Sequence, residues 1–236
     1  MLRALTSALR LPRPRRPLEA RGCAANLAAA NREIQVCALA GPDQGITEIL
    51  MNRPSARNAL GNVFVSELLE ALAQLREDQQ VRVLIFRSGV KGVFCAASSA
   101  VMGLIETTRG LFPGAGGTQR LPRCLGVALA KELIFTGRRL SGAQAQALGL
   151  VNHAVAQNEE GNAAYHRARA LAQEILPQAP TAVRLGKVAI DRGTEVDIAS
   201  GMAIEGICYA QNIPTRDRLE GMAAFREKRP PRFVGE

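Results

Sequence analysis

Apolar positions alternate or recur at helical spacing along the first part of the chain, and they predict strands and a helix in a definite order. Residues 33–52 predict a hairpin, with apolar positions on each arm and a glycine-containing turn at 41–45. Residues 63–75 carry apolar side chains at helical spacing, with charged residues on the other face. Residues 81–86 form a nearly continuous apolar run that is typical of a strand covered on both faces. Strand, helix and strand in this order predict an α/β fold.

The chain from residue 125 onward has an almost wholly helical pattern. Residues 194–197 resemble a capping arrangement that opens a long helix to about residue 212. Residues 214–215 predict the start of a last helix, which ends at the prolines 230–231. The residues expected to cap or stop the helices before these are Gly137, Ser141, Gly149 and Pro177.

Positive charge is concentrated in residues 1–32. The formal net charge of the chain is +9, and this segment holds seven arginines against one glutamate, which accounts for +6. Leucines interspersed with these arginines predict a mitochondrial presequence and a location in the matrix. A basic arm that binds anions is the alternative, whereas a secretory signal is disfavoured because no uninterrupted apolar core follows the first arginines. No apolar run is long enough to predict a transmembrane helix.

The cysteines and histidines predict neither a disulfide framework nor a metal site. Five cysteines are irregularly spaced without a C-x-x-C pair, which favours reduced thiols in the matrix or cytosol. Each cysteine is interpreted as a small buried hydrophobic residue. His153 and His166 have no partners at the spacing of a metal site or a catalytic triad, so both are expected to be structural or surface residues.

The segment 106–120 places one carboxylate, Glu106, seven residues before a glycine-rich turn at 113–118. Glycines permit positive φ and close approach of the backbone to a ligand. The turn lacks the Gly-Lys-Ser/Thr of a P-loop, and Gln119 breaks the dinucleotide-binding fingerprint. Taken alone, the pattern is better explained by a tight turn that packs against a helix.

Further motifs change this interpretation, because together they resemble the enoyl-CoA hydratase (crotonase) family. The matching segments follow the expected order: 52–60, 92–96, 106–120 and 221–233. The resemblance covers nearly all of residues 33–236 and is nearest to the methylglutaconyl-CoA hydratase branch, whose members include an RNA-binding protein. It implies a crotonase-like ββα superhelix core over 33–170, and a C-terminal helical region over 171–236 for trimerisation and contact with CoA.

The resemblance also implies a site and a reaction, the addition of water to a 2-enoyl-CoA thioester in fatty-acid or branched-chain amino-acid breakdown. Glu106 corresponds to the carboxylate credited with protonating the α-carbon, although a solvated glutamate is the alternative. The substrate is the only ligand implied, without a separate cofactor, and the assembly implied is a trimer or hexamer. The residues implied in substrate binding are Ala56 and Arg57 at the CoA nucleotide, Gly114 in the glycine turn, and Phe225 and Lys228 from a C-terminal helix, often that of a neighbouring subunit.

The chain departs from the family pattern near Ala96–Ala97. Several tens of residues that carry both oxyanion-hole donors and a second glutamate are absent at this join, while the motifs on either side stay in register. Loss of one oxyanion donor costs about 3–4 kcal/mol of transition-state stabilisation, and loss of an acid or base costs roughly 10²–10⁴-fold in rate. The sequence therefore predicts a hydratase by descent whose activity is impaired, with apolar core surface left uncovered.

Two alternatives to catalysis remain at this point. One is a non-catalytic subunit or scaffold that assembles with related proteins through its C-terminal helices. The other is binding of AU-rich RNA, by analogy with the methylglutaconyl branch. RNA binding is disfavoured because residues 57–71 offer Arg57 alone and add Glu67 and Glu70, whereas phosphate contacts require clustered cations.

Overall fold

The structure is a computed structural model that describes residues 32–90 and 101–236. The predicted presequence, apart from its last residue, lies outside these ranges. So do the 92–96 motif and the join at Ala96–Ala97, together with Cys23 and Cys95. None of the helices in the described ranges is long and apolar enough to cross a membrane.

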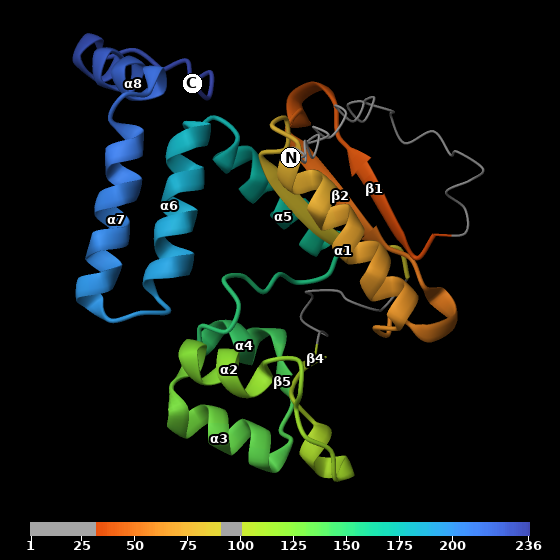
Figure 1. The fold of residues 1–236 in the computed structure, drawn as a ribbon. Coiled ribbons are helices and arrows are strands. Elements are labelled where there is room, and N and C mark those ends of the chain that lie inside the picture. Colours follow the sequence, from red (N-terminus) through yellow and green to blue (C-terminus); the bar gives the residue numbers. More distant parts are fainter. Residues whose placement is uncertain (1–31, 91–100) are drawn as a thin grey trace, which may run out of the picture.

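A three-stranded sheet forms the first part of the fold (Figure 1). Strand β1 (Ile34–Ala38) pairs antiparallel with β2 (Ile46–Met51) across a turn that contains the 3-10 helix η2 (Gly41–Asp43), which confirms the predicted hairpin. Helix α1 (Asn62–Glu77) then leads to β3 (Val83–Ser88), which lies parallel to β2. The predicted strand–helix–strand unit is therefore present, with its last strand two residues later than the apolar run indicated.

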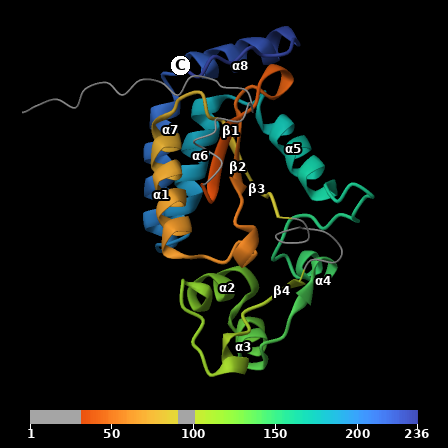
Figure 2. The same cartoon turned by 90° about the vertical axis from the view of Figure 1, so that its right-hand side faces the viewer.

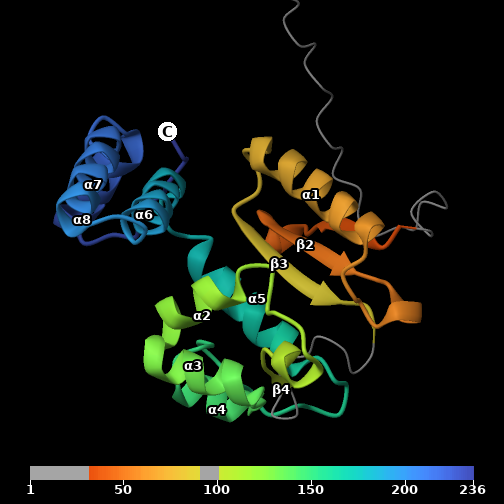
Figure 3. The same cartoon turned by 60° about the horizontal axis from the view of Figure 1, so that its bottom comes forward.

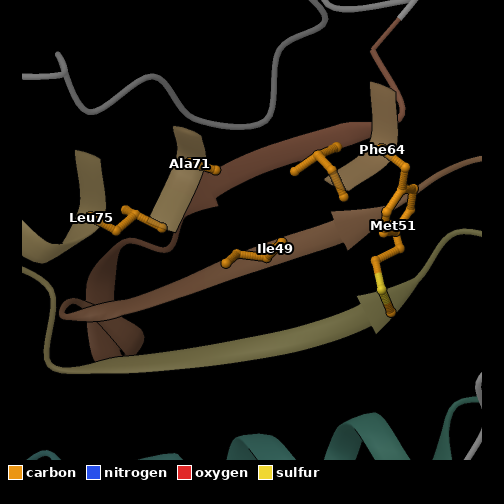
Figure 4. Close-up of a cluster of buried hydrophobic side chains, with 6 residues drawn as sticks. Ile49, Met51, Phe64, Ala71 and Leu75 are labelled. Carbon is orange, nitrogen blue, oxygen red and sulfur yellow. The ribbon is translucent and has the colours of Figure 1, made fainter. Parts of the chain in front are cut away.

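Helix α1 covers one face of the sheet, and the predicted apolar face is confirmed in part. Leu68, Leu72 and Leu75 pack against the sheet, whereas Val63 and Leu69 are exposed. Phe64 is fully buried, and it packs with side chains that β1 and β2 direct to the same face (Figure 4). This match between a 3.6-residue period on the helix and a two-residue period on the strands produces a continuous apolar layer. The buried members of this cluster are Ile34, Ile49, Met51, Phe64, Ala71 and Leu75.

Helix α5 (Ala163–Ile175) covers the opposite face, so the sheet lies between α1 and α5 (Figure 3). Its Ala172 packs against Ile46 and Ile85, all three of which are buried. The helix ends just before Pro177, as predicted. The expected boundary between residues 170 and 171 falls inside this helix, because α5 belongs by its packing to the sheet although it comes late in the sequence.

The α5 face of the sheet also contains buried polar groups. Glu48 on β2 is buried and lies 3.0 Å from Arg87 Nε on β3. The Arg87 guanidinium lies over the ring of Tyr165 on α5, 5.2 Å from its centre. Burial, together with the neighbouring Glu48 carboxylate, raises the pKa of Tyr165 to about 12. The opposite charges of Glu48 and Arg87 balance each other beside Tyr165.

A small second lobe follows the sheet. Two short strands pair antiparallel, and three helices surround a core formed by Leu133, Leu140 and Ala145. The elements are β4 (Val101–Met102), the 3-10 helix η4 (Glu106–Arg109), α2 (Gly117–Leu125), α3 (Val127–Thr136), β5 (Leu140–Ser141) and α4 (Gly142–Ala147).

The predicted helix ends in this lobe are confirmed. Gly137 follows α3 with a φ of 60°, which is the left-handed conformation that glycine adopts without steric cost. Ser141 caps α4 in a capping box, in which its hydroxyl accepts from Gln144 N at 3.2 Å and Gln144 Oε1 accepts from Ser141 N at 2.9 Å. Gly149, with a φ of 76°, follows the last turn of α4.

The C-terminal region is helical, as predicted. Helices α6 (Pro180–Gly193) and α7 (Ile198–Asn212) form an antiparallel pair, and α8 (Arg216–Glu227) crosses one end of it (Figures 1 and 2). The expected cap at 194–197 is partly wrong, because Thr194 ends α6. Asp197 alone opens α7, where its carboxylate accepts from the backbone N–H groups of Ala199 and Ser200.

The cysteines differ from one another in burial. Cys208 on α7 is buried, as expected, whereas Cys124 on α2 is exposed, so the interpretation as a buried hydrophobic residue is wrong for Cys124. Both histidines are structural or surface residues, as expected. His153 Nε2 lies 2.9 Å from Arg167 Nη2, and the ring of His166 lies against that of Tyr165.

Candidate functional site

Glu106 begins the 3-10 helix η4 in the second lobe and is half-buried. Thr107 Oγ1 donates to the carbonyl of Ile134 at 2.7 Å, and this bond ties η4 to α3. The Oε2 atom of Glu106 is buried and has no hydrogen-bond partner within residues 32–90 and 101–236. An unpaired buried oxygen is costly and uncommon in proteins. The unpartnered oxygen is compatible with a functional role for Glu106, although the buried Glu33 Oε2 and Arg87 Nε also lack a hydrogen-bond partner among the described residues.

The glycine turn packs closely on the segment that carries Glu106. At Gly117, the first residue of α2, an added Cβ would lie 2.8 Å from Leu104 Cδ1, so only glycine allows this approach without a shift of Leu104. Gly116 has a φ of 82°, and the Arg120 side chain donates to the carbonyl of Ala115 across the turn. Gly114 is exposed, and an added Cβ there would meet nothing within 4 Å. The space beside Gly114 is therefore open, which is compatible with its expected role.

A cavity of about 320 Å³ lies beside this segment. Its walls are mainly apolar, with the guanidinium-bearing residues Arg120 and Arg138 and the exposed Cys124 among them. Leu104 and Gly117 line the cavity, but Glu106 does not. The cavity therefore adjoins the Glu106 segment without containing the carboxylate.

Ala56 and Arg57 lie in the loop that follows β2. Ala56 ends the 3-10 helix η3 (Pro54–Ala56), and Arg57 is exposed with a φ of 49°. Because β2 and β3 are parallel, this loop and the segment after β3 leave the sheet at the same edge. Ligands in open α/β sheets bind at the carboxyl ends of parallel strands.

Phe225 and Lys228 lie at the end of α8. Phe225 is 85% exposed, and Lys228 is the C-cap of the helix with a φ of 53°. The next residue, Arg229, donates from both terminal nitrogens to Glu220, at 2.6 and 2.9 Å. These hydrogen bonds lower the pKa of Glu220 to about 2. The ion pair lines a groove of about 550 Å³ between α8 and the C-terminal residues.

The structure brings only some of these residues together within one chain. Glu106 and Gly114 belong to the second lobe, and Ala56 and Arg57 to the sheet edge. Helix α8 lies at the opposite end of the molecule from the second lobe (Figures 1 and 2). Phe225 and Lys228 therefore do not approach Glu106 of their own chain. The role of each of these residues in binding stays a prediction.

Sequence reasoning missed Asn58, which organises the loop after β2. Its side-chain oxygen accepts from Arg53 N at 2.8 Å, and its side-chain nitrogen donates to Ser88 Oγ at 2.8 Å. Asn58 was visible only as part of a motif, without a role. The one local signal was an asparagine in a polar stretch, where a left-handed conformation and bonds to the backbone are common.

Comparison with known proteins gives the same family throughout. A family model described as enoyl-CoA hydratase/isomerase matches residues 41–99 and 96–236. "Enoyl-CoA hydratase domain-containing protein 2, mitochondrial" of Bos taurus is 73% identical, and its human counterpart is 69% identical, with all of each chain covered. Human "Methylglutaconyl-CoA hydratase, mitochondrial" is 41% identical over 86% of this chain and 78% of its own. These names place the relatives in mitochondria, as predicted for this chain.

The alignment with the bovine relative extends over 296 positions, whereas this chain has 236 residues. Since all of this chain is covered, 60 aligned positions have no residue of this chain opposite them. The two segments matched by the family model overlap at 96–99. Apart from these 60 positions, this chain aligns with the bovine relative over its whole length.

Solved structures confirm the crotonase-like α/β fold. The crystal structure of an enoyl-CoA hydratase from Bacillus anthracis has a TM-score of 0.79 and 32% identity, covering 87% of this chain and all of that one. An enoyl-CoA hydratase subunit from Geobacillus kaustophilus has a TM-score of 0.76 and 26% identity, covering 86% of this chain and 98% of that one. The chain therefore belongs to the enoyl-CoA hydratase/isomerase (crotonase) family.

Proposed function

We propose that this chain is an enoyl-CoA hydratase-family lyase of the mitochondrial matrix, and that hydration is impaired in this shortened form. The observation that carries the proposal is the buried, unpartnered Oε2 of Glu106 ahead of the glycine turn. The substrate is a 2-enoyl-CoA thioester from fatty-acid or branched-chain amino-acid breakdown, and no separate cofactor is involved.

In the proposed reaction, water adds to the β-carbon of the enoyl group and Glu106 delivers a proton to the α-carbon. Negative charge develops on the thioester oxygen between these events and requires preorganised hydrogen-bond donors. A second carboxylate must remove a proton from the attacking water. The 60 aligned positions without a residue of this chain are enough to hold these two parts, and Glu106 is retained. The expected consequence is slow hydration rather than a different reaction.

The test is hydration of crotonyl-CoA by this chain, measured beside the 296-position bovine relative under the same conditions. We expect turnover at least 10³-fold below that of the relative, in keeping with the loss of an oxyanion donor. Glu106→Gln is expected to abolish what remains. Glu132→Gln is the matched control, because Glu132 is an exposed glutamate of α3 that pairs with Arg138 at 2.8 Å.

Two results would contradict this proposal. Turnover equal to that of the relative would show that hydration is not impaired. Residual turnover unchanged by Glu106→Gln would remove Glu106 from the reaction.

A second candidate function is that of a non-catalytic subunit in an assembly with related chains, and exposed apolar side chains on the C-terminal helices favour it. Ile198 and Tyr209 on α7 are 81% and 62% exposed, and Phe225 on α8 is 85% exposed. Where exposed apolar side chains lie together, they mark interaction surfaces. We propose a homotrimer, a hexamer or a mixed assembly. A strictly monomeric chain at micromolar concentration would contradict the homotrimer and the hexamer. Co-purification of the tagged chain with its full-length relative tests the mixed form, and its failure would contradict that form.

A further inference from the structure

Asn58 closes the loop after β2 by binding both backbone groups of a single residue. Its Oδ1 accepts from Arg53 N at 2.8 Å, while its own backbone N–H donates to the carbonyl of Arg53 at 3.0 Å. The loop between these two residues includes Ala56 and Arg57. Its conformation is therefore fixed at both ends by one asparagine.

The same side chain joins this loop to the neighbouring parallel strand. Asn58 Nδ2 donates to Ser88 Oγ at the end of β3, at 2.8 Å. Ser88 Oγ also contacts the residue two positions on, accepting from Val90 N at 2.9 Å and lying 3.1 Å from its carbonyl oxygen. The carboxyl ends of β2 and β3 are thus connected through two side chains.

This connection supports a backbone conformation that is common for asparagine but uncommon for arginine. Arg57 and Asn58 have φ values of 49° and 58°, so two successive residues with side chains are in the left-handed region. Such conformations persist where the surroundings hold them, and they concentrate at functional sites. The bonds of Asn58 to Arg53 and Ser88 supply that support here.

The guanidinium groups of the two arginines in this loop differ in their interaction partners. Arg53 is used within the loop, since its Nε lies 2.8 Å from Glu33 Oε1 and its Nη1 donates to the carbonyl of Ala59 at 2.7 Å. Arg57 is exposed and forms no ion pair with any residue of 32–90 or 101–236. The loop closed by Asn58 therefore presents a guanidinium without an ion pair among the described residues, at the carboxyl ends of β2 and β3. Ligands of open α/β sheets commonly bind at such strand ends.

We infer that Asn58 and Ser88 are positioning residues that hold Arg57 toward the phosphates at the nucleotide end of a CoA thioester. This inference rests on the proposed function, from which it takes the ligand. All of its residues precede position 90, before the join near residues 96–97, so the subsite does not depend on the catalytic half. Binding of the nucleotide end is then separable from Glu106 and from the acyl group.

The test is titration calorimetry of the full chain with CoA, with adenosine 3′,5′-bisphosphate and with S-acetylpantetheine, which lacks the nucleotide. We expect Asn58→Ala to weaken CoA and the bisphosphate by about 3- to 10-fold, as for loss of one or two hydrogen bonds, and to leave S-acetylpantetheine unchanged. Ser88→Ala is expected to give a smaller loss, and Ser88→Thr, which keeps the hydroxyl, to restore affinity. Asn162→Ala is the control, at an asparagine whose side chain bonds to Asn158 and Glu160 on the surface.

Thermal melts establish that each variant is folded before its affinity is compared, and Ser88→Ala serves if Asn58→Ala does not fold. A folded variant with the wild-type affinity for CoA would overturn the positioning role alone. An equal loss for S-acetylpantetheine would also overturn it, because a general loosening of the protein would then explain the effect. A wild-type chain that binds neither CoA nor the bisphosphate would instead contradict the proposed function.

Discussion

Asp43 and Arg169 are 126 positions apart in the sequence, yet Arg169 Nε and Nη2 lie 2.8 and 2.6 Å from Asp43 Oδ2. Gln173 Nε2 donates to the other carboxylate oxygen at 2.8 Å. The pair fastens the turn between β1 and β2 to α5. Charge-assisted hydrogen bonds of this kind are shorter and stronger than neutral ones.

This pair predicts a stability contribution that depends on pH. The hydrogen bond from Arg169 holds the pKa of Asp43 below its ordinary value of 3.8. A carboxyl group with a lowered folded-state pKa contributes stability above its unfolded-state pKa, and the contribution is lost as pH falls through the folded-state pKa. Asp43→Asn is expected to lower Tm by a few degrees at pH 7, with the difference from wild type vanishing in strongly acidic buffer.

Melts of wild type and Asp43→Asn between neutral pH and pH 2.5 make this comparison. Asp191→Asn is the control, since Asp191 forms an exposed ion pair with Lys187 within one helix. A difference in Tm that stays constant over the whole pH range would contradict the assignment.

The apolar cluster between α1 and the sheet predicts that truncation of a core side chain lowers stability strongly. Phe64 is fully buried among Ile34, Ile49 and Met51. Phe64→Ala is expected to reduce the free energy of unfolding by about 3–5 kcal/mol, because apolar contacts are lost and a cavity remains. Urea unfolding followed by circular dichroism measures this change in the free energy of unfolding. Val63→Ala, one position earlier and 61% exposed, is expected to change stability by less than about 0.5 kcal/mol.

Gly103 lies between β4 and the segment that carries Glu106, and its close contact predicts a steric effect of substitution. An added Cβ would lie 2.9 Å from the backbone oxygen of Arg138, which cannot move aside as a side chain can. Gly103→Ala is expected to destabilise the protein by about 1–3 kcal/mol. Gly186→Ala in α6, where an added Cβ meets nothing within 4 Å, is expected to be neutral or stabilising by up to about 1 kcal/mol. Equal free energies of unfolding of the two variants in urea would contradict this prediction, because the backbone near Arg138 would then have moved to admit the methyl group.

Lys228 predicts opposite effects on stability and on binding. Its φ of 53° is costly for a residue with a side chain but not for glycine. Lys228→Gly removes this strain, but glycine also adds entropy to the unfolded chain, which offsets part of the gain. The free energy of unfolding is therefore expected to stay unchanged or to rise by up to about 1 kcal/mol. Under the proposed function the substitution weakens CoA binding, which calorimetry measures. A destabilised variant would contradict the strain, and an unchanged affinity would contradict the CoA contact.

Local patterns predicted the elements well because their causes are local. The hairpin around residues 41–45, the cap at Ser141 and the stop at Gly137 each depend on a few neighbouring residues. The cap at 194–197 was partly misplaced, since both Thr194 and Asp197 can accept from backbone N–H groups. In the structure α6 runs to Gly193 with Thr194 as its C-cap, and Asp197 is the N-cap of α7.

The candidate site was predictable only in part. The motif placed Glu106 before a glycine turn, but its buried, unpartnered oxygen follows from packing that no local pattern encodes. The connection from Asn58 to Ser88 joins residues 30 positions apart, and a sequence gives no direct signal of such a bond. Long-range contacts of this kind depend on how the strands are arranged and not on the residues beside them.

The position of α5 has a consequence for the order in which the chain acquires structure during synthesis. Within the residues that the structure describes, α1 and the three strands of the sheet have been made once residue 88 is added, yet the second face of that sheet stays uncovered until α5 has followed. Ile46 and Ile85 remain open to water over that interval, together with the charged Glu48 and Arg87. The N-terminal unit therefore becomes stable only after about three quarters of the chain has emerged, and over that interval its exposed face is most prone to aggregation.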